Sequence, residues 1–218
     1  MGLKRWTGSG YADVDLGHAE KALVWDGSEY VQVWPTSMPF SFVGASSAID
    51  FNPVSIPAHQ PGDLLVIAGG GLSTPTAASG WTSAFTGGGG LINVRVGYKI
   101  ATSTSESPVT WTDASSTVCG VWRGPKSVRG VATGGSGSSI SFPALTLTAT
   151  GQSWTARMSA ATSGIPGQPT TAPRTVRLAA NRCGVWDSDG YSTANIAAGT
   201  STAGGSPYWG SVTIELLP

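Results

Sequence analysis

The segment Leu91-Ile-Asn-Val-Arg-Val-Gly-Tyr-Lys-Ile100 carries the clearest secondary-structure signal of the chain. Its apolar side chains recur at every second position from Ile92 to Ile100, and Asn93, Arg95 and Lys99 lie between them. Successive side chains of a strand point to opposite faces, so this alternation predicts a β-strand with one buried and one polar face.

Segments on both sides of this strand predict further strands separated by short polar turns. Leu64–Ala68 follows the turn Pro61-Gly-Asp63 and is apolar on both faces, which predicts a central, fully buried strand. The other expected strands are 40–51, 117–122, 139–148, 152–161, 174–180 and 211–216, and the glycine-rich segments 87–90, 134–137 and 199–205 are expected loops. Strand after strand without a helix predicts an all-β fold, an antiparallel β-sandwich of jelly-roll type or similar, over residues 39–218.

Residues 1–38 contain an internal repeat that predicts small β-hairpins. Trp6-Thr-Gly-Ser-Gly-Tyr-Ala-Asp-Val14 aligns with Trp25-Asp-Gly-Ser-Glu-Tyr-Val-Gln-Val33 at Trp, Gly, Ser, Tyr and Val. A lone hairpin is marginally stable in water, so these units must pack on each other, on the following domain or on another chain. We expect an attachment region, and the residues expected at its interface are Trp6, Tyr11, Trp25, Tyr30 and Trp34.

The composition is neutral and poor in charge. Of 218 residues, 11% are charged, Lys+Arg and Asp+Glu number 12 each, and there are 31 Gly. A chain with zero net charge has no general attraction to nucleic acid or to anionic membranes. No apolar stretch reaches the roughly 20 residues of a membrane span. Because no apolar segment follows Lys4 and Arg5 as in a signal peptide, we expect synthesis in the cytoplasm and no membrane insertion.

The sequence contains no motif that predicts catalysis, a cofactor or a metal site. His18 and His59 lie far from any nucleophile motif, and we expect both to be solvated surface side chains. Asp187-Ser-Asp-Gly190 resembles the start of a calcium loop, but few oxygen ligands follow it, which favours an Asp-rich turn. We therefore expect no enzymatic activity, no cofactor and no metal, with a hydrolase that uses Asp187 and Asp189 as an alternative.

The two cysteines, Cys119 and Cys183, are predicted to be buried free thiols. Both begin the sequence Cys-Gly-Val-Trp. This repeated context favours two similar strands that neighbour each other in one sheet, whereas the spacing does not decide whether the thiols meet.

Tryptophan is unusually frequent, with 9 residues spread over the chain. Trp122 and Trp154 lie inside expected strands and are predicted core residues. Trp81 and Trp209 lie beside turns, where aromatic rings can contact a ligand or a partner. The residues with a predicted ligand contact are Trp81, Tyr208 and Trp209.

Several segments together resemble a β domain of tailed-phage structural proteins, namely Gly62-Asp-Leu-Leu-Val66, Ser79-Gly-Trp-Thr82, Arg95–Ala101, Val118–Gly124 and Trp209–Leu216. Their order is similar to that in the minor tail proteins of phages that infect mycobacteria and related actinobacteria. Lys21–Trp34 looks like the Trp-Asp-Gly-Ser hairpins of the same family.

The resemblance implies a non-enzymatic virion protein at the tail tip or baseplate, with a part in host-surface adhesion. Its expected partners are other virion proteins, a host cell-surface glycan and further copies of itself, with a trimer favoured by the symmetry of such assemblies. A capsid decoration or head-fibre protein is one alternative. A carbohydrate-binding β-sandwich without catalytic residues is another.

Overall fold

The computed structural model describes residues 40–89, 91–205 and 207–218, together with Ser28 and the backbone of four N-terminal strands. The chain divides into two compact units, Met1–Pro39 and Phe40–Pro218, one residue after the predicted boundary. The described residues form strands and connecting segments without helix, which confirms the all-β prediction. Within these residues no helix has the length and apolar character needed to cross a membrane.

The N-terminal unit contains two antiparallel hairpins at the positions of the sequence repeat. β1 (Lys4–Trp6) pairs with β2 (Tyr11–Asp13), and β3 (Ala22–Trp25) pairs with β4 (Tyr30–Trp34). Trp6 lies opposite Tyr11 in the first hairpin, and Trp25 lies opposite Tyr30 in the second. The aligned residues of the repeat therefore occupy the same register positions.

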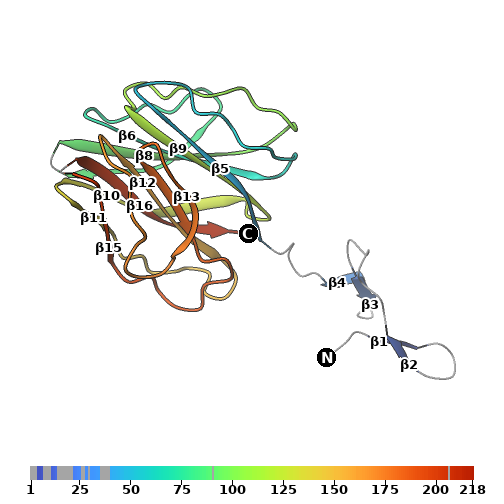
Figure 1. Ribbon diagram of the computed structural model, residues 1–218. Coiled ribbons are helices and arrows are strands. Elements are labelled where there is room, and N and C mark those ends of the chain that lie inside the picture. Colours follow the sequence, from blue (N-terminus) through green and yellow to red (C-terminus); the bar gives the residue numbers. More distant parts are fainter. Residues whose placement is uncertain are drawn as a thin grey trace. The chain divides into compact units, whose positions relative to one another are not determined.

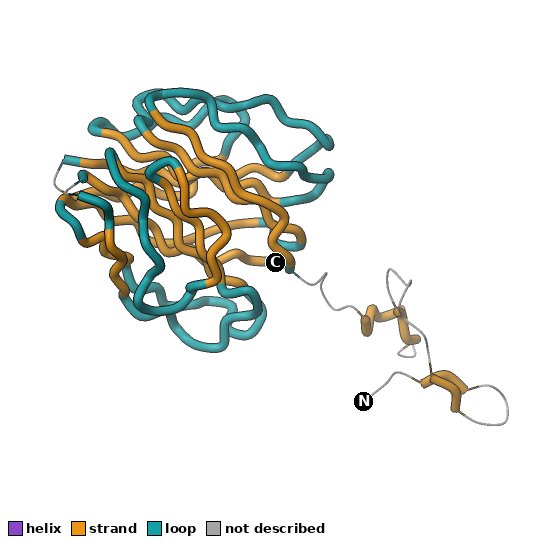
Figure 2. The backbone as a smooth tube through the Cα atoms, in the orientation of Figure 1, coloured by secondary structure: helices purple, strands orange, loops and turns teal. Residues whose placement is uncertain are grey.

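The second unit is a sandwich of two five-stranded antiparallel sheets, packed face to face (Figures 1 and 2). The first sheet has the order β5-β9-β6-β8-β7, with bounds Ser41–Ile49, Ser116–Arg123, Leu64–Gly71, Ile92–Ile100 and Thr82–Gly89. The second has the order β10-β16-β12-β14-β13, with bounds Ser127–Ser136, Tyr208–Leu217, Trp154–Ala161, Cys183–Asp187 and Thr175–Ala180. A separate pair, β11 (Ser139–Phe142) and β15 (Gly199–Thr202), accompanies the second sheet.

The two sheets have the same topology. If the five strands of each sheet are lettered a to e in chain order, both sheets read a-e-b-d-c. The registers also correspond, because Leu64 lies opposite Trp122 in the first sheet and Trp154 lies opposite Leu216 in the second. Strand a of one sheet lies across from strand c of the other, and the two b strands, β6 and β12, face each other. The sandwich thus consists of two halves related by an approximate twofold axis parallel to the strands.

Glycine and tryptophan exchange places between the two halves. Gly97 of β8 corresponds to Trp186 of β14, because each pairs with the equivalent position of strand b. Trp111 corresponds to Gly199 through the residues that follow them. The carbonyl oxygen of Thr112 accepts from the Thr76 amide, and that of Thr200 accepts from the Thr170 amide in the equivalent loop. At this place on the outer face, the indole therefore comes from the loop in the first half and from the strand in the second.

The apolar core lies between the sheets and includes Leu64, Val66, Met158 and Ile214. The prediction of a central, fully buried strand is confirmed, since all of β6 is buried. The strand is longer than expected and includes Gly69–Gly71, because Trp111 and Ala160 pack so close to these glycines that a side chain would meet them. Trp122 and Trp154 are core residues as predicted, at 0% and 6% exposure.

Three segments predicted as glycine loops belong at least partly to strands. Gly87–Gly89 lie in β7, Gly134 and Gly135 lie in β10, and Gly199 begins β15. β7 and β10 are edge strands of different sheets whose backbones meet, because a Cβ on Gly87 would lie 2.4 Å from the Ala132 carbonyl oxygen. Glycine is needed here for close backbone approach rather than for a turn. Conversely, the expected strand 139–148 ends at Phe142.

The cysteines are buried free thiols, as predicted. The expectation that they occupy neighbouring strands of one sheet is wrong, since Cys119 lies in β9 and Cys183 in β14 of the other sheet. Burial raises the pKa of the Cys183 thiol to about 12, so it stays protonated at neutral pH.

Candidate functional site

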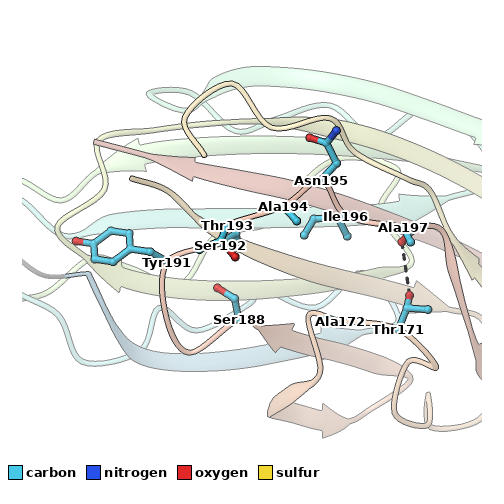
Figure 3. A pocket seen from close by; sticks show the side chains of 10 residues that line it. All are labelled: Thr171, Ala172, Ser188, Tyr191, Ser192, Thr193, Ala194, Asn195, Ile196 and Ala197. Atoms are coloured by element: carbon cyan, nitrogen blue, oxygen red, sulfur yellow. Dashed lines mark hydrogen bonds between the residues drawn. The ribbon is translucent and has the colours of Figure 1, made fainter. Parts of the chain in front are cut away.

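A cavity of about 360 Å³ opens on the outer side of the second half, between the segment after β14 and the loop before β13 (Figure 3). Tyr191 and Thr171 lie at opposite ends of the group of lining side chains (Figure 3). The lining residues, none of which is charged, are Thr171, Ala172, Ser188, Tyr191, Ser192, Thr193, Ala194, Asn195, Ile196 and Ala197. The cavity is therefore neutral and combines methyl, hydroxyl and amide groups.

Arg157 of β12 ties together the two walls of this cavity. Its Nη1 donates to the Thr171 carbonyl and hydroxyl oxygens at 2.5 and 3.0 Å, and its Nη2 donates to the Ala197 carbonyl at 2.6 Å. The guanidinium is fully buried and also lies over the Phe142 ring, 5.2 Å from its centroid. Gly199 permits this arrangement, since a Cβ there would lie 2.6 Å from Nη1.

Burial lowers the pKa of Arg157 to about 10, because the charged form loses solvation. The side chain still carries its charge at neutral pH. In the described part of the chain it donates to carbonyl and hydroxyl oxygens rather than to a carboxylate. Its effect on the cavity is to hold the positions of two loops.

Of the eight large apolar side chains exposed among the described residues, five lie at the opposite end of the sandwich from the domain's own termini, and the other three are Val131, Val176 and Tyr191. β5 begins and β16 ends at one end, beside Phe40 and Pro218, because Ser41 pairs with Arg123 and Leu217 pairs with Ser127. We call the other end the distal end, and its loops expose the side chains of Phe51, Leu72, Leu91, Ile165 and Tyr208. Exposed apolar groups at a common end of a domain are typical of a contact surface.

The predicted ligand residues do not come together. Trp81 is half-buried and packs edge-on against Trp111, with ring centroids 6.2 Å apart, on the outer side of the first half. Tyr208 lies at the distal end and is 37% exposed. Trp209 is 5% exposed and belongs to a cluster with Phe142 and Trp186, so the expected ligand contact does not fit its position.

Trp209 is buried because its indole lies across Gly135 of the neighbouring strand, where a Cβ would come within 2.6 Å of the ring. The expected attachment residues Trp6, Tyr11, Trp25, Tyr30 and Trp34 have side chains outside the described residues, so their role stays a prediction.

The close acidic pair is engaged by a single arginine. Arg177 donates from Nε to Asp187 at 2.9 Å and from Nη2 to Asp189. Trp122 donates its indole N–H to Asp187 from the opposite sheet at 3.1 Å. Burial raises the pKa of Asp187 above its ordinary value, against the bonds from Trp122 and Arg177, which lower it. This arrangement fits an Asp-rich turn that links the two sheets.

His59 is buried, at 7% exposure, so the prediction of a solvated side chain is wrong. Its Nδ1 lies 2.7 Å from the Pro57 carbonyl oxygen. The loop folds inward because Asp63 accepts hydrogen bonds from the Gln60 amide and from Arg123. His18 lies outside the described residues.

The cavity residues were not among the candidates from the sequence. The segment Tyr191-Ser-Thr-Ala-Asn195 offers few ligands for calcium, and the sequence predicts no other role for it. The local signal for the site is the alternation of Tyr191, Thr193 and Asn195 with small residues, because these three side chains are exposed. The contribution of Thr171 depends on a contact between distant segments, which no local pattern predicts.

Comparison with protein-family models, with curated proteins and with solved structures finds no match for this chain.

Proposed function

We propose that the chain is a structural virion protein of a tailed phage, a minor tail component at the tail tip or baseplate that takes part in host-surface adhesion. In this proposal the hairpins of Met1–Pro39 attach the protein to other virion proteins. The sandwich Phe40–Pro218 is displayed, and the protein acts as a homo-oligomer, for which a trimer is our first expectation.

The observation that carries the proposal is the division of the chain into two structurally different units. Two hairpins of matching register precede an independent sandwich with its own core. The sandwich leads into the hairpin region at Phe40 and exposes apolar side chains at its distal end. This arrangement suits a module that is anchored on one side and makes contact on the other, and it agrees with the sequence resemblance.

The contacts of the acidic side chains in the sandwich support a binding role over a catalytic one. Asp187 and Asp189, the acids considered for hydrolysis, are both held by Arg177. A carboxylate engaged in this way is poorly placed to attack a substrate or to transfer a proton. Turnover of a cell-wall preparation that Asp187→Asn abolishes would contradict this part of the proposal.

Labelling of intact particles tests the location. Gold-conjugated antibody raised against residues 40–218 is expected to label the tail end in electron micrographs. Label over the capsid would instead support the capsid decoration or head-fibre alternative. Absence of label on every particle, with the epitope accessible in the free protein, would contradict the virion proposal and favour a carbohydrate-binding module.

A second test addresses attachment. Deletion of Met1–Pro39 is expected to abolish incorporation into particles while the sandwich stays folded. A folded deletion variant that is still incorporated would show that the hairpins are not the attachment region.

A further inference from the structure

Three residues that line the cavity on the second half, Tyr191, Thr193 and Asn195, carry polar groups available to a ligand. The Tyr191 side chain lies at one end of the cavity, with its hydroxyl pointing away from the other lining side chains (Figure 3), and its ring packs on Phe40 with centroids 5.4 Å apart. Among the hydrogen bonds of the described residues, none engages the Tyr191 hydroxyl, the Thr193 hydroxyl or the Asn195 amide nitrogen. These three residues alternate along an exposed segment, and the Ser192 and Ile196 side chains between and after them are buried. The segment thus presents its polar side chains outward and is anchored through Ser192 and Ile196.

The frame around these groups is fixed by buried hydrogen bonds. The Ser192 and Thr155 hydroxyls lie 2.9 Å apart, and Asn195 Oδ1 accepts from the Leu147 amide at 2.9 Å. That second bond leaves the Asn195 amide nitrogen as the free donor. Arg157 holds the facing wall through Thr171. A preorganised site loses less conformational entropy when it binds a ligand.

The first half of the sandwich fills the corresponding region with apolar side chains. Ala77 and Ala78 follow Thr76 and so correspond to Thr171 and Ala172, which follow Thr170. In the first half these alanines pack against the cluster around Trp111, together with Trp81 and Val109. The position equivalent to Trp111 in the second half is Gly199, beside the buried Arg157. The same framework therefore supports a filled apolar cluster in one half and an open, uncharged cavity in the other.

We propose that this cavity binds one or two residues of a neutral saccharide. A sugar ring presents hydroxyl groups that pair with amide and hydroxyl partners, and it also presents C–H faces that pack on methyl groups and aromatic rings. The cavity offers both kinds of surface, through Thr193 and Asn195 and through Ala172, Ala194 and Tyr191. Its volume of about 360 Å³ lies at the lower end of the range for ligand sites, which suits a short saccharide.

The absence of charged side chains from the lining selects a neutral ligand over an anionic one. The proposal deepens the function proposed above, since it names the ligand class and the site of a displayed adhesion domain. A small, open site makes few contacts, so the affinity for a free monosaccharide is expected to be on the order of 1 mM.

The experiment is a titration of the full ¹⁵N-labelled chain, followed by amide correlation spectra. The probes are glucose, galactose, mannose, arabinose and N-acetylglucosamine, each alone, with glucuronic acid as the charged comparison. At least one neutral sugar is expected to give saturable shifts at the amides of 171–172 and 188–197. Glucuronic acid is expected to give weaker shifts at these amides.

Substitutions then assign the contact. Thr193→Val removes a hydroxyl at nearly constant volume and is expected to weaken binding about fivefold, which is the loss of one typical hydrogen bond. Tyr191→Ala is expected to weaken it further. Thr86→Val is the matched control, because Thr86 is exposed as Thr193 is and lies in β7 of the other sheet. It should bind as the unaltered chain does.

Shifts confined to other regions, or no saturable shift with any neutral sugar up to tens of millimolar, would overturn the saccharide site. Binding by the Thr193→Val and Tyr191→Ala variants that is as strong as binding by the unaltered chain would also overturn it. Because the titration uses the free chain, a negative result leaves the location on the virion to be decided by antibody labelling.

Discussion

At the scale of single residues, the repeated Cys-Gly-Val-Trp sequence has a packing explanation. In β9 a Cβ on Gly120 would lie 2.3 Å from the Trp122 ring, and in β14 a Cβ on Gly184 would lie 2.0 Å from the Trp186 ring. Each indole lies back over the glycine two positions earlier on the same face of the strand. Trp122 faces the opposite sheet, whereas Trp186 faces outward into the cluster with Phe142.

Gly184→Ala is expected to destabilise the fold by about 3 kcal/mol, because the new methyl group would force the Trp186 ring out of its packed position. Chemical denaturation, followed by tryptophan fluorescence, measures the change in the free energy of unfolding. Gly190→Ala is the control, since its Cβ would meet nothing closer than 3.9 Å. An equal, small effect of both substitutions would show that the indole position is not fixed by the glycine.

Glu215 is the other residue on which local stability depends. It points away from the sandwich core and is fully buried beneath the segment that follows β11. Burial by itself would raise the pKa of this carboxyl, but the amides of Ala149 and Thr148 and the Ser153 hydroxyl outweigh burial, and the pKa falls below 4.5. Arg129 adds an ion pair at 2.6 Å.

A lowered pKa in the folded state means that Glu215 stabilises the fold above pH 4.5, the ordinary value, and that this contribution is lost as the pH falls through the folded value. Glu215→Gln is expected to cost about 3 kcal/mol at neutral pH, because Arg129 and the buried amides lose a charged acceptor. The difference in free energy of unfolding between the unaltered chain and the variant should become smaller below pH 4.5, which unfolding measurements across pH can test. A difference in free energy of unfolding that stays constant with pH would show that the ionised Glu215 carboxylate is not the source of this stability.

At the scale of elements, the contact between β7 and β10 closes one edge of the sandwich. Cβ atoms on Gly87 and Gly89 would lie 2.4 and 2.3 Å from the carbonyl oxygens of Ala132 and Gly134. A backbone-to-backbone approach of this kind leaves no room for side chains, and it protects two edge strands that would otherwise be open to pairing with other chains.

Gly87→Val is expected to separate β7 from β10 and to destabilise the domain by about 2 kcal/mol. Amide hydrogen exchange should become faster in both strands, because their contact is lost. Thr86→Val serves as the control, since Thr86 is the exposed preceding residue of the same strand. Unchanged exchange in β10 of the Gly87→Val variant would show that the edge contact does not depend on glycine.

At the scale of the whole molecule, the chain consists of a hairpin unit and a sandwich with two topologically identical halves. The halves keep one framework and differ in their outer layers. The first has an apolar layer of Leu65, Ile67 and Trp111, and the second has buried polar residues, Arg157 and Glu215 among them. The neutral cavity follows from this difference.

Removal of Met1–Pro39 is expected to leave the unfolding temperature of the sandwich within a few degrees of that of the full chain, because the sandwich has its own core. Scanning calorimetry of both proteins measures this directly. A large decrease would show that the sandwich depends on the hairpins for stability.

Several features could be predicted from local pattern. The alternation in Leu91–Ile100, the apolar run at Leu64 and the Trp–Tyr repeat each reflect a periodicity of two or a turn, which neighbouring residues alone specify. Burial of Trp122 and Trp154 followed from their positions inside strands. The prediction of loops at Gly87–Gly89, Gly134–Gly135 and Gly199 is wrong because glycine permits both turns and close backbone approach, and sequence does not distinguish these uses.

The sequence by itself therefore determined the all-β class, the sandwich, the hairpin repeat and the buried thiols, because these depend on side-chain pattern along one strand at a time. Only the tertiary structure decided the identical topology of the two sheets, the burial of His59 and Trp209, and the cavity beside Thr171 and Asn195. These features arise where segments far apart in the chain meet, and the fit between such segments depends on packing and hydrogen bonds that no local pattern records.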